Sequence, residues 1–420
     1  MISELSKSYS FRVISRKSLF TLGILMIYIL GRNIPLPFVG QQAIPRQEMN
    51  NFMSYAMMAA GGDASTRSLV TLGVGPYMST MMIWRFVSMS DWFKRKKLSM
   101  EQSGRLQNLL TLVIGLIQAM GIVASYQLGQ VTRAGIIGSI NWMQALLVLF
   151  LLAGSLFTIW LGFQNSKHGF GQFTVFICIS IISRYAFSPE IYRDYFSSIA
   201  SSQEIRVLLI LGLLAVISFM GTIIFELAEL RIPLNRIMID SEYNEKNYLP
   251  IKLNPSGGMA IMYAMTFLAL PQYLLAAIEL VIGPKDWIQA TRSSLEMTSW
   301  TGVLLYLGTL FGLSILMAFV NVNPSELTDQ LKRSGDYILG IRPGRPTEYF
   351  LSRQVLRLSL IGAVFLTIVA GGPMLFGVIY PEYQQILFLP GSISIVGGIM
   401  ISVVLEMRAY YQRGQYGPLL

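Results

Sequence analysis

The chain alternates between long apolar segments and shorter polar connections. Ten apolar segments are each long enough to cross a hydrocarbon layer of roughly 30 Å as a helix. They lie at 18–37, 69–90, 106–128, 140–163, 170–188, 205–228, 257–282, 300–320, 357–379 and 386–408. The fifth segment is the weakest, because Arg184 interrupts it near its end. The pattern predicts an all-α integral membrane protein with ten transmembrane helices.

Ten spans divide into five plus five. Because each half has an odd number of spans, the second half enters the membrane inverted relative to the first. We therefore expect an N-terminal half at 1–200 and a C-terminal half at 201–420, with a pathway at their interface near the membrane midplane.

Composition and charge agree with a membrane protein and give it an orientation. The chain is 53% hydrophobic and only 13% charged, and its mean hydropathy is +0.54. With the N-terminus inside, the inner segments carry 22 Lys and Arg residues and the outer segments carry 8. This excess predicts a multi-pass protein of the cytoplasmic membrane with both termini in the cytoplasm. The net charge of +10 then reflects topology and contact with membrane lipid, and indicates no nucleic-acid partner.

Two inner connections are unusual. Residues 321–357 are polar and rich in Arg, Gly and Pro, and they are far longer than two packed helices need as a connection. This length and charge favour a docking surface. Residues 229–256 mix apolar alternation with basic residues and prolines, which is typical of a short cytosolic hairpin. This hairpin is either a solvated connection or a binding site for a partner.

An apolar segment at 51–60 is too short to cross a bilayer. Gly61 and Gly62 follow it, and a polar run precedes the next span. Two interpretations stay open: an amphipathic helix on the outer surface, or a movable plug. A half-helix is tolerated at membrane depth only where it is buried in protein or lines a cavity.

The residues offer little for enzyme chemistry. His168 is the only histidine and Cys178 the only cysteine, so a metal site or a Cys/His nucleophile pair is not expected, and no intrachain disulfide can form. No phosphate-binding loop of the Walker type is present. We therefore expect neither an enzyme nor a bound cofactor.

Ionisable groups within the spans are few. Arg32, Arg85, Arg184 and Glu226 fall near span ends, where we expect them to snorkel toward water. A coupled small-molecule carrier usually needs a carboxylate near the midplane, and the pattern shows none. This favours a passive conduit that an external motor drives.

Several motifs together resemble one family. The inner segment 321–357 carries NPSEL and then LKRSGDYILGIRPGRPTEYF. The second span reads SLVTLGVGPYMSTMMI and the seventh reads KLNPSGGMAIMYAMTFLALP. The inner segment 229–256 begins with ELRIPLN. These motifs are similar, in the same order, to those of SecY protein-translocation channels. The resemblance covers roughly residues 20 to 410. It implies a ten-helix channel in two halves that passes unfolded polypeptide across the membrane or sideways into lipid.

The resemblance also implies roles for particular residues. The family has a ring of six apolar side chains at the waist of its pore, a plug, and a seam between the second/third and seventh/eighth helices that opens laterally. The matching ring positions are Val74, Met78, Thr174, Cys178, Met262 and Ile395. The matching plug positions lie within 51–62 and include Phe52, Met53, Met57, Met58, Gly61 and Gly62.

Partners follow from the same resemblance. In this family the long inner loop receives the SecA-type motor ATPase, and Arg342 matches its characteristic arginine. The other basic residues implied in motor docking are Arg231, Lys332, Arg333 and Arg345. SecE-type and SecG-type small subunits are the implied membrane partners.

Some features depart from the common family pattern. Trp84–Arg85 replaces an Ile–Gln pair, Ala260 replaces a proline, and the fifth-helix ring positions are more polar than usual. With the compact loops, these features resemble the accessory SecY channels of some Gram-positive bacteria, which export glycosylated, serine-rich adhesins. The alternatives are a housekeeping SecY channel for general secretion and membrane insertion, a small-molecule carrier, and a membrane enzyme.

Overall fold

The computed structural model describes residues 2–37, 52–63, 67–89, 99–126, 136–137, 140–186, 202–236, 248–283 and 285–415. A helix occupies each of the ten predicted spans. These helices are α1 (Ile2–Arg32), α4 (Gly75–Met89), α6 (Met100–Ser125), α7 (Trp142–His168), α8 (Thr174–Ala186), α10 (Ser202–Leu227), α11 (Met259–Ile282), α13 (Trp300–Val322), α15 with α16 (Arg345–Leu366 and Gly372–Ile379) and α18 (Leu389–Gln415). The all-α, ten-helix membrane fold is therefore confirmed.

Shorter elements connect these helices. They are α3 (Phe52–Ala59), α12 (Asp286–Ser294), α14 (Pro324–Ser334), α17 (Gln384–Leu387), β1 (Ile136–Ile137), β2 (Ile140–Asn141), β3 (Glu229–Arg236), β4 (Tyr248–Lys252) and β5 (Asp336–Ile338). The boundary that we predict between the halves at residue 200 lies outside the described residues.

Length and composition make seven of the described helical segments able to cross a membrane, and two further apolar helical segments are shorter. Large apolar side chains point outward from these helices, as Leu19 does on α1 with 75% of its surface exposed. An outward apolar face is expected where lipid, not water, is the solvent.

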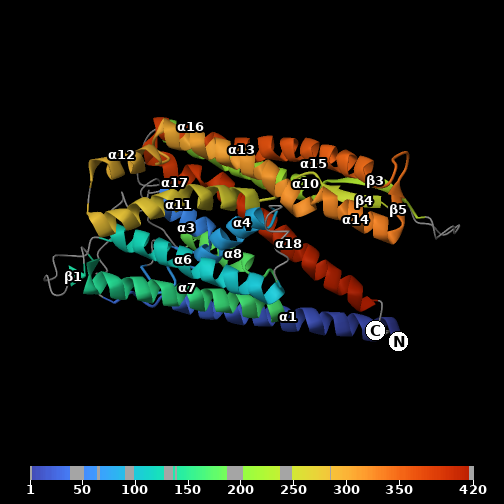
Figure 1. Cartoon of the computed structure of the whole chain (residues 1–420), viewed down its shortest axis with the longest axis horizontal. Helices are drawn as coiled ribbons and strands as arrows, with labels where there is room; N and C mark the ends of the chain where they lie inside the picture. The colour runs from blue at the N-terminus through green and yellow to red at the C-terminus, as the bar shows by residue number, and fades with distance from the viewer. Residues whose placement is uncertain are drawn as a thin grey trace.

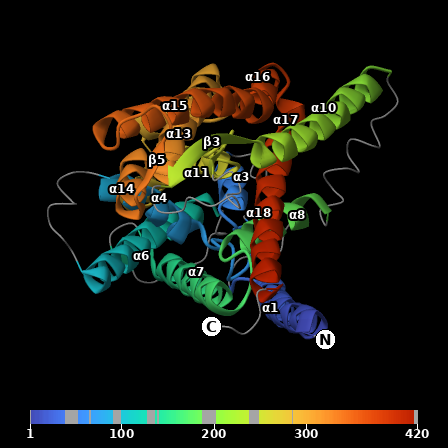
Figure 2. The same ribbon diagram turned by 90° about the vertical axis from the view of Figure 1, so that its right-hand side faces the viewer.

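The helices form two outer layers around a central group (Figures 1 and 2). The first-half helices α1, α6 and α7 make one layer, and the second-half helices α10, α13 and α15 make the other. Between them lie α3, α4, α8, α11 and α18, whose apolar residues form one continuous buried core that spans both halves. The start of α1 and the end of α18 lie at the same end of the molecule as β3, β5 and α14 (Figure 1).

The two unusual inner connections fold into one unit. The predicted hairpin is confirmed, since β3 pairs antiparallel with β4 and brings Ile232 opposite Leu249. On its other side β3 pairs with β5, with Leu234 opposite Ile338, so the strand order is β4-β3-β5. A separate small core of Ile232, Ile251, Leu331, Ile338, Leu351 and Leu358 joins this sheet to α14 and α15.

Residues 321–357 are more regular than a loop. Asn323 adopts a left-handed conformation (φ 40°) that ends α13, and Pro324 then starts α14. Gly335, with φ 73°, ends α14 and turns the chain into β5. Helix α15 begins at Arg345, earlier than the apolar span at 357–379 suggests, because its first turns lie in the polar part of the sequence.

Candidate functional site

The short helix α3 is packed in the centre of the protein. Met53, Tyr55, Met57 and Met58 are each at most 6% exposed, and α3 lies against α11 and α8. The ring of Tyr55 stacks on that of Phe388, with centroids 3.8 Å apart. The interpretation of residues 51–60 as an external surface helix is therefore wrong.

Glycines let the end of this segment come close to the start of α4. Gly61 and Gly73 have positive φ values of 77° and 52°. A Cβ atom on Gly73 would overlap the carbonyl group of Gly61, and one on Gly62 would overlap the carbonyl oxygen of Thr71. Because only glycine has no Cβ, this backbone contact requires it. The segment 52–63 is thus held directly against the segment that leads into α4.

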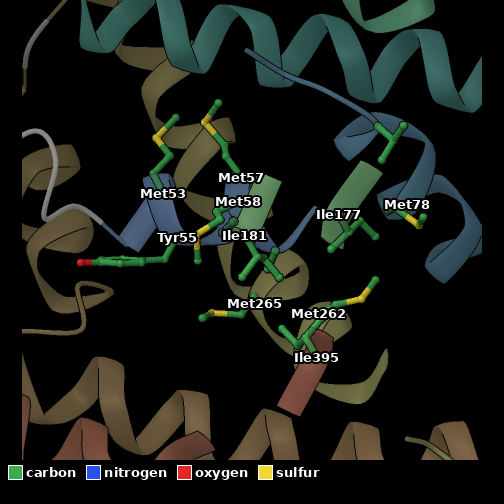
Figure 3. Close-up of a cluster of buried hydrophobic side chains, with 14 of the residues drawn as sticks. Met53, Tyr55, Met57, Met58, Met78, Ile177, Ile181, Met262, Met265 and Ile395 are labelled. Atoms are coloured by element: carbon green, nitrogen blue, oxygen red, sulfur yellow. The ribbon is translucent and has the colours of Figure 1, made fainter. Parts of the chain in front are cut away.

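An apolar cluster lies beside this segment, built by four helices from both halves (Figure 3). Val74 lies directly before α4, Met78 on α4, Met262 on α11 and Ile395 on α18, and all are at most 7% exposed. The side chain of Val74 packs against Gly61. With Cys178 of α8, five of the six predicted ring positions therefore lie in one buried core.

The fifth span adds two isoleucines beside the predicted Cys178. Ile177 and Ile181 of α8 lie with Met262 and Ile395 in the apolar cluster (Figure 3). Cys178, which is 7% exposed, belongs to the same buried cluster, whereas Thr174 lies outside it and lines a neighbouring cavity. The spacing of four residues does not separate the two pairs, because Thr174 and Cys178 share it with Ile177 and Ile181.

A cavity of about 660 Å³ lies on the side of this cluster that faces the β3–β5 sheet. Its wall includes Ile395 and Thr174 at the inner end and residues of β4 and α14 at the outer end. Its charged and polar lining comes from both halves and includes Arg85, Glu226, Lys252, Asn321 and Glu406. The cavity is therefore a vestibule whose wall carries charged and polar side chains and reaches the apolar cluster at Ile395.

Helices α4 and α6 of the first half meet α11 and α13 of the second half along a closed seam. On α4, Arg85 donates a hydrogen bond of 3.1 Å to the side chain of Asn321 at the end of α13, and Asn321 donates one of 2.8 Å to the carbonyl oxygen of Pro255. Beside this bridge, Met82, Tyr263 and Met317 form a buried apolar group of their own. These contacts join the two halves at the seam.

Charged side chains are buried at two places where we expect snorkelling. Arg32 and Arg184 both pair with Asp63, and the three side chains are 8%, 2% and 3% exposed. Glu226, 6% exposed, pairs with Lys252 at 3.4 Å. The snorkelling expectation is wrong for Arg32, Arg184 and Glu226, because folding of the chain brings a partner to each of them inside the protein.

The predicted docking residues lie on the surface of the sheet unit. Arg231 on β3 is 61% exposed and its guanidinium lies 4.7 Å from the centre of the Tyr248 ring. Lys332, Arg333, Arg342 and Arg345 are also exposed. The hydroxyl of Thr347 donates a 2.9 Å hydrogen bond to the carbonyl oxygen of Arg342, which fixes the turn before α15.

An apolar groove of about 780 Å³ runs between α8, α10 and α18. Its lining is almost entirely apolar and includes Ile182, Val216, Phe219, Ile393 and Met400. These helices lie on the side of the molecule away from α6 (Figure 2). Among the described residues, no group of three or more His, Cys, Asp or Glu side chains could hold a metal ion.

Comparison with known proteins gives consistent matches. The SecY family model matches residues 68–408. A protein of Streptococcus sanguinis named "Accessory Sec system protein translocase subunit SecY2" is 34% identical over 419 residues, which is 99% of this chain and 100% of that protein. A protein of the same name from Leuconostoc gelidum subsp. gasicomitatum is 32% identical over 412 residues, 97% of each chain.

Solved structures share the fold at lower identity. One is described as "The structure of a protein conducting channel", with a TM-score of 0.68, 18% identity, and 96% of this chain and 93% of that chain covered. Another, "Sec61 in the Canine ribosome-channel complex from the endoplasmic reticulum", has a TM-score of 0.65 and 17% identity over the same shares of the two chains.

Proposed function

Because the chain belongs to the SecY family and is the channel subunit of a protein translocase, we propose that a cytosolic ATPase of the SecA type drives unfolded polypeptide through it. The chain is a multi-pass membrane protein of a family that works with partner subunits and a translocated polypeptide. Its family conducts protein and is not known for catalysis.

The observation that carries the proposal is the buried apolar core between the two halves. We propose that six of its side chains form the ring of a constriction: Val74, Met78, Ile177, Ile181, Met262 and Ile395. An apolar constriction blocks ions because it loses its water, yet its side chains can move aside for a passing chain. The plug, which we expect at 51–62, falls on the described segment 52–63 beside this cluster, and Gly61 and Gly62 allow its close contact with the residues before α4.

The polar vestibule is the cytosolic entrance. Its outer wall belongs to the β3–β5 unit, which carries exposed basic residues and lies at the same end as both termini. Positive charge at this end is expected on the cytoplasmic side. Arg342 and Arg231, with Lys332, Arg333 and Arg345, form the motor-docking surface, since exposed guanidinium groups make strong hydrogen bonds to carboxylates.

Two features of the helices support a lateral exit for the polypeptide and a binding site for the small subunits. The seam of α4 and α6 against α11 and α13 lies between the two halves, and its parting would release a hydrophobic segment into lipid. The groove between α8, α10 and α18 has the apolar lining that a transmembrane helix of a SecE-type or SecG-type subunit requires.

The transported protein is of a restricted class. Relatives that share 32% and 34% identity over nearly the whole chain are named as accessory Sec subunits. We therefore propose that the substrates are a few large glycosylated serine-rich adhesins, exported beside a separate general channel.

Removal of the gene from its host tests the proposal. We expect growth and bulk secretion to continue while one or a few large glycosylated proteins disappear from the cell surface, as measured by quantitative surface proteomics. Re-expression of the wild-type gene should restore them. General secretion arrest with loss of viability would instead identify a housekeeping channel, and an unchanged surface proteome would contradict the export function.

A further inference from the structure

Three charged side chains from distant parts of the chain meet beside the plug. Arg32 lies at the end of α1, Asp63 two residues after Gly61, and Arg184 in the last turn of α8. One carboxylate oxygen of Asp63 is paired with Arg32, and the other lies 3.8 Å from a guanidinium nitrogen of Arg184. We call this group the Asp63 cluster.

The cluster is attached to the plug at two points. Asp63 directly follows Gly62 of the plug, and its backbone N–H donates to the carbonyl oxygen of Thr71 at 2.8 Å. The guanidinium of Arg184 also lies 5.3 Å from the centre of the Tyr55 ring on α3, a cation–π distance. Arg184 therefore connects the plug helix with the carboxylate that follows it.

Burial makes these contacts depend on one another. The three side chains are 8%, 3% and 2% exposed, so each charge has little contact with solvent in this conformation. A buried charge that loses its partner is strongly unfavourable unless water or another ion replaces that partner. If the plug moves away with Asp63, both arginines lose the Asp63 carboxylate at the same moment. The ion pairs thus oppose plug movement until the site becomes hydrated.

We propose that Asp63 is a positioning residue that anchors the plug in the closed channel by pairing with Arg32 and Arg184, and that withdrawal of this carboxylate is a required step of opening. The inference rests on the proposed function of the 52–63 segment as a plug. It adds a charged anchor to the apolar contacts at the ring, and it assigns to Arg32 and Arg184 a part in gating.

The test measures ion conductance of the idle channel. The full channel complex carrying Asp63→Asn is compared with wild type in planar lipid bilayers, without motor or substrate. We expect idle conductance to rise at least about tenfold, since a tenfold change in an equilibrium corresponds to about 1.4 kcal/mol. Asp63→Glu retains the carboxylate, so we expect its conductance to stay within about threefold of wild type.

A matched control removes a carboxylate elsewhere. Glu279→Gln breaks the pair of Glu279 with Arg292, 3.5 Å apart, between α11 and α12. We expect this variant to stay closed. If Asp63→Asn inserts poorly, Arg184→Gln tests the same anchor while keeping the Arg32–Asp63 pair, with a smaller expected rise. Unchanged conductance in a variant that inserts normally would overturn the anchor.

Motor-driven export by the same samples separates this inference from the proposed function. We expect Asp63→Asn to export a signal-bearing substrate at least as well as wild type. Normal export with wild-type idle conductance rejects the anchor alone. A wild-type complex that transports no polypeptide with its motor rejects the proposed function itself.

Discussion

Closure of the lateral seam should depend measurably on Arg85. Its hydrogen bond to Asn321 is the outer link of a chain that continues to the carbonyl oxygen of Pro255. A hydrogen bond from a charged donor contributes about 1.5–3 kcal/mol when it is shielded from water. Because the Arg85–Asn321 bond is solvent-exposed, we take about 1 kcal/mol. Arg85→Ala should therefore shift the balance between closed and open seam about fivefold toward the open state.

The apolar group beside the bridge should matter more. Met317 is fully buried, and its contacts with Met82 and Tyr263 exist only while α13 lies against α4 and α11. Truncation of a buried methionine to alanine costs about 2–5 kcal/mol. Even at the low end of this range, Met317→Ala should shift the same balance about thirtyfold.

The assay is export of a reporter that carries signal segments of decreasing hydrophobicity. A seam that opens more easily should accept weaker segments, so the hydrophobicity needed for half-maximal export should fall in Arg85→Ala and fall further in Met317→Ala. Arg105→Ala is the control, because the Arg105–Glu101 pair lies within α6 and its side chains are 81% and 86% exposed. Identical thresholds in wild type and both seam variants, at equal channel levels, would refute this account of the seam.

Two further predictions concern the ring and the docking surface. Ile177→Asn should make the idle channel leak ions, because a polar side chain hydrates the constriction. Thr174→Asn is the control and should not raise the ion conductance. Equal conductance in the two variants would remove Ile177 from the ring. Arg342→Glu should abolish motor-driven export while the protein still inserts, because it reverses the charge of an exposed docking group. Arg105→Glu is its control in vesicle export assays, and normal export by Arg342→Glu would reject the docking role.

Hydrophobic patterning predicts the spans well, because the bilayer fixes the length of every apolar segment. It does not predict the fold of residues 321–357. There, β5 forms only by pairing with β3, about a hundred residues earlier in the chain. Polar turn-rich sequence indicates a surface segment, but such a distant pairing leaves no local signal.

The choice of ring residues on the fifth span shows a similar limit. Thr174 and Cys178 share the spacing of Ile177 and Ile181, and all four positions belong to one short helix, α8. Which face of such a helix is buried depends on its packing against α18, α3 and α1. The sequence predicts the spacing, and the tertiary structure buries Ile177, Cys178 and Ile181 in the core but not Thr174.

The buried charge of Asp63 raises the question whether an ion gradient could power transport. Asp63 stands in a polar run after an apolar segment, which is typical of an exposed connection, but the Gly61–Gly62 turn returns it to the interior. The protein thus buries a carboxylate among its helices, and the apparent lack of an intramembrane carboxylate was what favoured an external motor. Asp63, however, is held by two arginines of the same chain. A carboxylate that binds a coupling ion must exchange partners during the transport cycle, and Asp63 can do so only when the 52–63 segment moves. Its ion pairs are therefore tied to opening of the channel, and an external motor remains the proposed source of energy.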